Sequence, residues 1–293
     1  MQPAVATCAF HPGRPTGLTC SRCGRPACPE CLTPASVGFH CRACVAESRG
    51  QQRVARTVAG SRLGQQPVVT AALIAVNVVV FVVTAVQAGS VSDPSGSSVF
   101  RQGATIPELV SAGQYWRLLT GGFLHFGLPH IALNMISLYL LGMPLERILG
   151  RGRFLVVYLV ALLGGSVSVL LFSGSSLGPT VGASGAIFGV MGAMVVTFRR
   201  LRLDPRQLFG LLAVNLVISF ALPGISWQAH IGGLLTGAAA GAVMVYPPAR
   251  NRTAWQVGGS VALVVLLGVV TAVWAGGHPA QFCSLQGDYF LPC

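Results

Sequence analysis

The stretch that decides the fold is GASGAIFG, residues 182–189. It opens an apolar run that continues to residue 198 and is followed by Arg199 and Arg200. Small residues of this kind allow two membrane helices to approach closely. Ser184, however, also carries a hydroxyl group. The stretch is therefore either a packing surface alone or a packing surface that positions a reactive side chain.

Similar apolar runs recur along the whole chain. Of its 293 residues, 53% are hydrophobic and 9% are charged, and the mean hydropathy is +0.68. These values exclude an ordinary soluble domain. The runs of spanning length predict seven membrane helices, at about 68–87, 127–145, 154–173, 183–198, 207–222, 228–246 and 256–275. We therefore predict an all-α polytopic membrane protein.

The basic residues predict how this protein lies in the membrane. All 19 are arginines, and all but Arg101 and Arg117 lie before the first predicted span or after the second, fourth and sixth. Positive charge gathers on the cytoplasmic side of membranes. We expect a multi-pass plasma-membrane protein with a cytoplasmic N-terminus and an outer C-terminus. The net charge of +12 then reflects topology and attraction to the lipid bilayer, and no nucleic-acid partner is expected.

The cysteines divide in the same way as the charges. No signal peptide is expected, since the first 60 residues are polar and rich in Cys and Arg. All but two of the nine cysteines precede residue 45, on the side where thiols stay reduced. The other two, Cys283 and Cys293, fall in the predicted outer tail, and the sequence leaves open whether they form a disulfide.

The N-terminal cysteines have the spacing of metal ligands. Each pair has two residues between its members, and the pairs are Cys8/His11, Cys20/Cys23, Cys28/Cys31 and Cys41/Cys44. A tetrahedral Zn²⁺ ion needs two such pairs, so eight donors predict two structural zinc sites. The short gap between the second and third pairs favours interleaved pairs, although spacing alone does not decide the pairing.

The module is similar to B-box and RING-like modules, and that resemblance implies that the first and third pairs share one ion and the second and fourth the other. We expect a zinc-binding module over residues 1–45, with a binding or regulatory role toward a cytoplasmic protein, and a flexible basic linker over 46–66.

Polar residues inside the predicted spans are the functional candidates, because they are costly in lipid. His130 and Asn134 share one helix face at the start of the second span, Ser184 opens the fourth, and His230 opens the sixth. Even-numbered spans run from the outside inward, so these starts lie at similar depth near the outer face. Small residues at Gly185 and along the sixth span allow the helices to approach.

These groups suggest nucleophilic catalysis. An imidazole at His230 could accept the hydroxyl proton of Ser184, and no acidic residue lies at this depth, so we infer a Ser–His dyad. The Asn134 amide, the His130 ring N–H and the backbone N–H near Ser184 are candidate donors to a developing oxyanion. Catalysis of this kind needs no cofactor.

The motifs resemble those of the rhomboid family of intramembrane serine proteases, over roughly residues 68–246. The matching elements, in the family's order, are WR (Trp116 and Arg117), HFGLPHIALN (125–134), GASG (182–185) and AHIGG (229–233). The resemblance implies a six-helix core over 67–246, followed by a seventh helix and an outer tail over 247–293.

The resemblance also implies roles for individual residues. Ser184 would be the nucleophile and His230 the general base. Asn134, His130 and the Ser184 backbone N–H would form the oxyanion hole, with Gly182 shaping the approach. Four further residues would have supporting roles in the core or the outer loop: His125, Trp116, Arg117 and Glu146. Gly185 would allow the helices to pack closely. For Glu146, pairing with neighbouring arginines is the preferred reading.

Three classes of function remain open. The first is an intramembrane protease that cleaves transmembrane segments of membrane proteins near the outer face. The second is a catalytically silent rhomboid-like protein that binds membrane clients, although such relatives typically lack the serine or the histidine. The third is a transporter or metal-handling protein that uses intramembrane histidines, with the zinc module as a sensor. The absence of acidic residues in the predicted spans disfavours this class.

Overall fold

The computed structural model describes residues 6–51, 55–172, 178–279, 282–286 and 289–292. The chain forms two compact units, Met1–Ala55 and Arg56–Cys293. The first unit contains the short 3-10 helix η1 (Pro29–Cys31), the antiparallel strands β1 (Leu32–Pro34) and β2 (Phe39–Cys41), and helix α1 (Arg42–Gln51). Its buried side chains are almost all cysteines, so this unit has very little apolar core.

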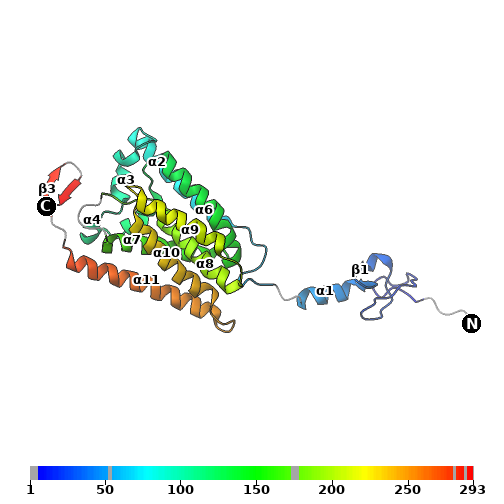
Figure 1. The fold of residues 1–293 in the computed structure, drawn as a ribbon. Coiled ribbons are helices and arrows are strands. Elements are labelled where there is room, and N and C mark those ends of the chain that lie inside the picture. Colours follow the sequence, from blue (N-terminus) through cyan, green and yellow to red (C-terminus); the bar gives the residue numbers. More distant parts are fainter. Residues whose placement is uncertain (1–5, 52–54, 173–177, 280–281, 287–288, 293) are drawn as a thin grey trace, which may run out of the picture. The chain divides into compact units, whose positions relative to one another are not determined.

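The second unit is a helix bundle (Figure 1). Six of its helices are long and apolar enough to cross a membrane: α2 (Val68–Ala88), α6 (Leu128–Leu149), α7 (Arg151–Phe172), α8 (Ser184–Leu201), α10 (Trp227–Val245) and α11 (Arg252–Gly277). These six agree with predicted spans, and the chain is a polytopic helical membrane protein.

The fifth predicted span, 207–222, forms a shorter helix than the other predicted spans. Helix α9 (Arg206–Ala221) has 16 residues and ends just before Pro223 and Gly224, which has a φ of +81°. At 1.5 Å per residue, it rises about 24 Å, less than the roughly 30 Å of a bilayer's hydrocarbon core. Proline and a left-handed glycine cannot easily continue a helix, which accounts for its early end.

The connection between α2 and α6 is more structured than expected. It contains the 3-10 helices η2 (Pro94–Gly96) and η3 (Gly121–Phe123) and the short helices α3 (Ser98–Gly103), α4 (Pro107–Ser111) and α5 (Arg117–Thr120). Near the C-terminus, strands β3 (Phe282–Gln286) and β4 (Tyr289–Pro292) form an antiparallel hairpin. Cys293, which a Cys283–Cys293 disulfide would need, lies outside the described residues.

The close contact of α8 with α10 is the centre of the bundle. A Cβ atom on Gly233 would collide with the backbone carbonyl of Gly185, and one on Gly237 would collide with the backbone of Gly189. Only glycine leaves room for two helix backbones at this separation. Helix α7, most of whose side chains are buried, packs against both.

Glu146 has a different role from the expected pairing with arginines. Its carboxylate is buried and accepts hydrogen bonds from the backbone N–H groups of Val69 and Thr70, at 2.9 and 2.7 Å, and from the Thr70 hydroxyl at 2.7 Å. These N–H groups open helix α2 and have no partner within that helix. The glutamate therefore caps the N-terminus of α2, where the helix dipole favours negative charge.

The glycine contact between α8 and α10 can be tested by adding a single methyl group. We expect Gly237→Ala to lower the free energy of unfolding by about 1–3 kcal/mol, because the new Cβ overlaps the Gly189 backbone. Gly268→Ala, on the exposed face of α11 with open space around it, should not lower it, because the added methyl group meets no neighbour and alanine favours a helix. Unfolding by denaturing detergent in mixed micelles measures both, and equal effects would contradict the packing argument.

Candidate active site

Ser184 is the first residue of α8, and its hydroxyl faces α10. Its Oγ atom lies 2.8 Å from Nε2 of His230, in the first turn of α10. The close glycine contact just below this point sets the distance, since the side chains bridge two helices whose backbones nearly touch. The arrangement allows transfer of the serine proton to the imidazole.

Two further side chains hold the His230 ring. Phe188 stacks on it with 4.1 Å between ring centroids and 13° between planes. On the far side of the ring, Nδ1 lies 2.6 Å from the hydroxyl of Ser219, on α9. Neither residue was predicted from the sequence. Phe188 follows Ser184 by four positions on the same helix face, so its place could have been inferred, whereas Ser219 belongs to another helix and no motif marks it.

The dyad opens into a cavity of about 490 Å³. Both residues line it, together with the predicted oxyanion-hole residues His130, Asn134 and Gly182. The starts of α6, α8 and α10 thus meet at one end of the bundle. A volume of this size is typical of a site for a small molecule or a short peptide segment.

His130 points toward the loop that precedes Ser184. The backbone N–H of Phe126 approaches Nδ1 of His130 at 3.5 Å, which leaves Nε2 as the nitrogen that carries the proton. Gly182 has a φ of +125°, and a Cβ atom there would lie 2.8 Å from this Nε2. Gly182 therefore keeps open the space between His130 and Ser184.

Asn134 lines the cavity, but its amide is engaged within its own helix. Nδ2 donates to the carbonyl oxygen of His130 at 2.9 Å. An amide nitrogen has two N–H groups, so one donor remains for an oxyanion. The backbone N–H groups at the start of α8 add further donors, because the first turn of a helix leaves them without internal partners.

The supporting residues lie at different distances from the chemistry. His125 is fully buried, and its ring meets that of His130 edge-on at 5.0 Å. Gly185 lines the cavity and touches α10. Trp116 and Arg117 do not line the cavity. Trp116 is exposed and donates to the carbonyl of Gln102, whereas buried Arg117 donates to the side chain of Gln114 and to the carbonyls of Arg101 and Ala104.

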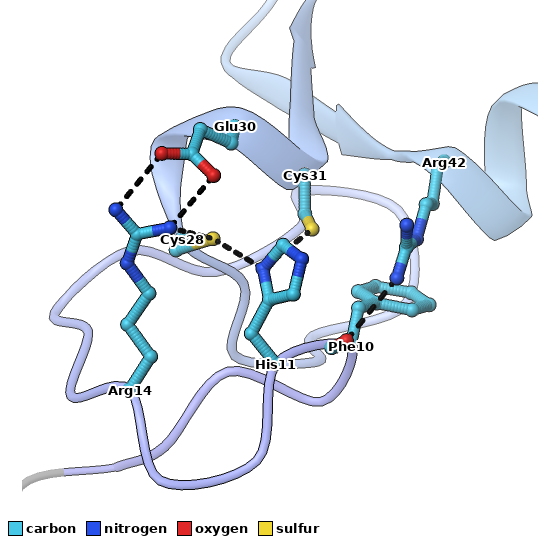
Figure 2. A network of polar contacts seen from close by, with 7 residues as sticks. All are labelled: Phe10, His11, Arg14, Cys28, Glu30, Cys31 and Arg42. Carbon is cyan, nitrogen blue, oxygen red and sulfur yellow. Dashed lines mark hydrogen bonds and ion pairs between the residues drawn. The ribbon is translucent and has the colours of Figure 1, made fainter.

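The N-terminal unit gathers its eight donors into two sets, each with all ligand atoms within 4.8 Å of one another. One set is Cys8, His11, Cys28 and Cys31, and the other is Cys20, Cys23, Cys41 and Cys44. In the first set, Nδ1 of His11 lies 3.2 Å from Sγ of Cys28 and 3.4 Å from Sγ of Cys31 (Figure 2). The sets combine the first pair with the third and the second with the fourth, so either could hold a metal ion.

The electrostatics of the second set also fit a cation. The backbone N–H of Cys41 donates to Sγ of Cys20 and lowers the pKa of that thiol to about 6. Hydrogen bonding to Cys23, together with burial, raises the pKa of Cys44 to about 12. Thiols this close cannot all ionise unless a positive charge lies among them.

Comparison with known proteins adds an independent observation. Residues 112–247 match the family model described as Rhomboid domain. The chain is 34% identical over 204 residues to the rhomboid protease GluP of Bacillus subtilis, which covers 68% of the chain and 39% of that relative. It is 36% identical over 171 residues to RHOMBOID-like protein 6, mitochondrial, of Arabidopsis thaliana, which covers 56% and 54%.

A third relative, Rhomboid-like protease 1 of Toxoplasma gondii, is 32% identical over 200 residues, which covers 64% of the chain and 66% of that relative. The chain therefore spans between 39% and 66% of the length of these curated relatives. The N-terminal metal-ligand sets lie before the region that the family model matches.

The two ligand sets predict the metal content of the full chain. We expect two metal ions per chain, and we expect His11→Ala to lose one of them because the first set then has three ligands. His40→Ala should retain both, since His40 belongs to neither set although it adjoins Cys41. Elemental analysis of the purified protein measures the content, and equal metal loss in the two variants would contradict the assignment.

Proposed function

Because the chain carries a rhomboid domain and belongs to the rhomboid family, we propose that it is an intramembrane serine endopeptidase that cleaves transmembrane segments of membrane proteins near the outer face. Ser184 is the nucleophile and His230 the general base. The observation that carries the proposal is the 2.8 Å contact between Oγ of Ser184 and Nε2 of His230 inside a cavity between membrane helices.

The chemistry follows from the positions of these groups. Nε2 of His230 takes the hydroxyl proton as Oγ of Ser184 attacks the scissile carbonyl carbon. The ring N–H of His130, an N–H of Asn134 and the backbone N–H of Ser184 are the donors available to the resulting oxyanion. His230 then protonates the leaving amine, and a water molecule that enters from the cavity hydrolyses the acyl-enzyme.

The substrate must present an extended backbone at this site. In an intact helix the scissile carbonyl is hydrogen-bonded internally and its carbon is shielded. Suitable substrates are therefore transmembrane segments that unwind near their outer end. The arginine distribution supports a plasma-membrane orientation with the N-terminus in the cytoplasm, which places the dyad near the outer face.

The N-terminal unit is proposed to bind two structural zinc ions. Sets of three or four cysteines, all buried here except Cys23, are typical of structural Zn²⁺. Ions with four protein ligands leave no open position for catalysis. The unit would therefore have a binding or regulatory role, for which a cytoplasmic protein is the candidate partner. The catalytic step itself uses no metal.

The dyad is tested by removing each of its members. We expect Ser184→Ala and His230→Ala each to lower cleavage of a single-span membrane substrate by at least about a thousandfold, because nucleophile and base act as a unit. Ser260→Ala, in helix α11 outside the cavity, should cleave normally. A fluorophosphonate probe should label the wild type and Ser260→Ala but not Ser184→Ala. Absence of cleavage by the wild type, with client binding or transport that survives in Ser184→Ala, would favour the client-binding or transport readings.

A further inference from the structure

The hydrogen bonds around His230 have a fixed direction. Oγ of Ser219 lies 2.6 Å from the carbonyl oxygen of Asn215 and 2.6 Å from Nδ1 of His230. A carbonyl oxygen can only accept, so the single hydroxyl proton of Ser219 is donated to Asn215. Oγ of Ser219 must therefore accept the proton of Nδ1–H.

This direction decides the tautomer of the imidazole. A neutral imidazole carries one N–H, and if that N–H is at Nδ1, the lone pair is at Nε2. Nε2 is the atom that faces Oγ of Ser184 at 2.8 Å. The ring is thus held as a proton acceptor toward the nucleophile, which is the state that a general base requires.

In serine proteases with a triad, a carboxylate orients the histidine in this way. Among the described residues, none that lines the cavity is acidic. We propose that Ser219, polarised by the Asn215 carbonyl, is the positioning residue that replaces the carboxylate and holds the productive tautomer of His230. This inference rests on the proposed protease function.

The placement of Ser219 has a mechanical consequence. The residue belongs to α9, whereas both dyad members belong to the tightly packed pair α8 and α10. Most side chains of α9 are exposed or only partly buried. Any displacement of α9 breaks the Ser219–His230 bond while the Ser184–His230 contact can persist, so α9 controls the tautomer without being part of the dyad.

The test compares variants that keep or remove the hydroxyl. Ser219→Ala should lower kcat about tenfold, in line with the loss of one buried hydrogen bond, with little change in KM. Ser219→Thr, which keeps the hydroxyl, should restore kcat. Ser260→Ala is the matched control, because Ser260 makes the same bond to the carbonyl four residues earlier but contacts no histidine.

A spectroscopic readout separates positioning from mere stabilisation. In protein labelled with ¹⁵N-histidine, Nδ1 of His230 should be the protonated nitrogen in the wild type and in Ser219→Thr, and both tautomers should be populated in Ser219→Ala. Normal kcat and an unchanged tautomer in Ser219→Ala would overturn this inference even if Ser184→Ala is inactive. Cleavage that survives in Ser184→Ala would instead overturn the proposed function itself.

A second observation, at the opposite end of the bundle, stands independently of the active site. Three arginines from separate segments lie close to one another: Arg56, Arg153 and Arg252. Nε of Arg153 donates to Oε1 of Gln256 at 2.8 Å, and Nε2 of Gln256 donates to the carbonyls of Ala59 and Met244. These bonds tie the 56–62 loop to the starts of α7 and α11.

The loop brings the other two guanidinium groups to the same place. Arg56 donates from Nη1 to the carbonyl oxygen of Gly60 at 2.8 Å. A Cβ atom on Gly60 would lie 2.8 Å from Nη1 of Arg252, so Arg252 packs directly on this glycine.

The positive charges in this cluster are not balanced within the described part of the chain. The ion pairs found there involve other arginines, and Glu146 is committed to the start of α2. Nε of Arg252 is buried and has no hydrogen-bond partner among the described residues. An anion would satisfy this donor and offset the mutual repulsion.

The geometry points to a binding site for a phosphate group of an anionic phospholipid. Guanidinium groups bind phosphate oxygens with paired hydrogen bonds, and the starts of α7 and α11 add favourable helix dipoles. The proposed topology places this end at the cytoplasmic leaflet, which is the leaflet rich in anionic lipid.

Trp255 makes the lipid measurable. It lies in the first turn of α11 beside Gln256 and is exposed. Trp116, Trp227 and Trp274 are first replaced by phenylalanine, so that Trp255 is the remaining tryptophan. In vesicles of phosphatidylcholine with a small share of brominated phosphatidylglycerol, its fluorescence should be quenched more than with the same share of brominated phosphatidylcholine. The excess should disappear in Arg153→Gln/Arg252→Gln and persist in Arg199→Gln/Arg202→Gln, which removes the same charge from the C-terminal end of α8.

Two outcomes would overturn the lipid site. The first is an equal loss of the excess in both double variants, since this would mean that general surface charge attracts the lipid. The second is complete displacement by inorganic phosphate at physiological concentration, since this would assign the cluster to free phosphate. Persistence of the excess in the presence of phosphate supports a lipid headgroup.

Discussion

The backbone contact between α8 and α10 is the constraint on which the rest of the molecule depends. Gly185 and Gly189 face Gly233 and Gly237 at a separation that any side chain would prevent. This contact places the first residue of α8 beside the first turn of α10, so a short serine side chain reaches an imidazole without strain. It also positions the cavity, because residues at the starts of α8 and α10 line it.

Polar groups are costly inside a membrane, so the few that lie there each make several contacts. His230 receives its orientation from Phe188 stacking and from a neutral hydroxyl, and not from a carboxylate that would be costly in this environment. The hydrogen bonds that link Asn215, Ser219, His230 and Ser184 set the orientation of the imidazole and involve no charged group. At the opposite end, where headgroups and water are close, charge is abundant and arginines cluster.

The membrane spans and the family were predictable because hydropathy, arginine placement and the four motifs are local features of the sequence. The contact between Ser184 and His230 was expected from the same signals, since the predicted topology gives their helix starts a similar depth, and their catalytic roles are proposed. Three features did not follow. Ser219 contacts His230 from a helix that carries no motif. Glu146 caps a helix some 76 residues earlier, a pairing that sequence neighbours do not reveal. Helix α9 is short because Pro223 and Gly224 together end it, and hydropathy alone does not show this.

The capping of α2 by Glu146 bears on the order in which the protein is built. Helices α2 and α6 precede α7, α8 and α10 in the chain, and the hydrogen bonds from Val69 and Thr70 to Glu146 involve none of these later helices. The two spans can pair as soon as both have entered the bilayer, while the segment that contains Ser184 is still in the ribosome. His130 and Asn134, on α6, would then already be in place when α8 and α10 pack against α6. The contact between Ser184 and His230 would form late in biosynthesis.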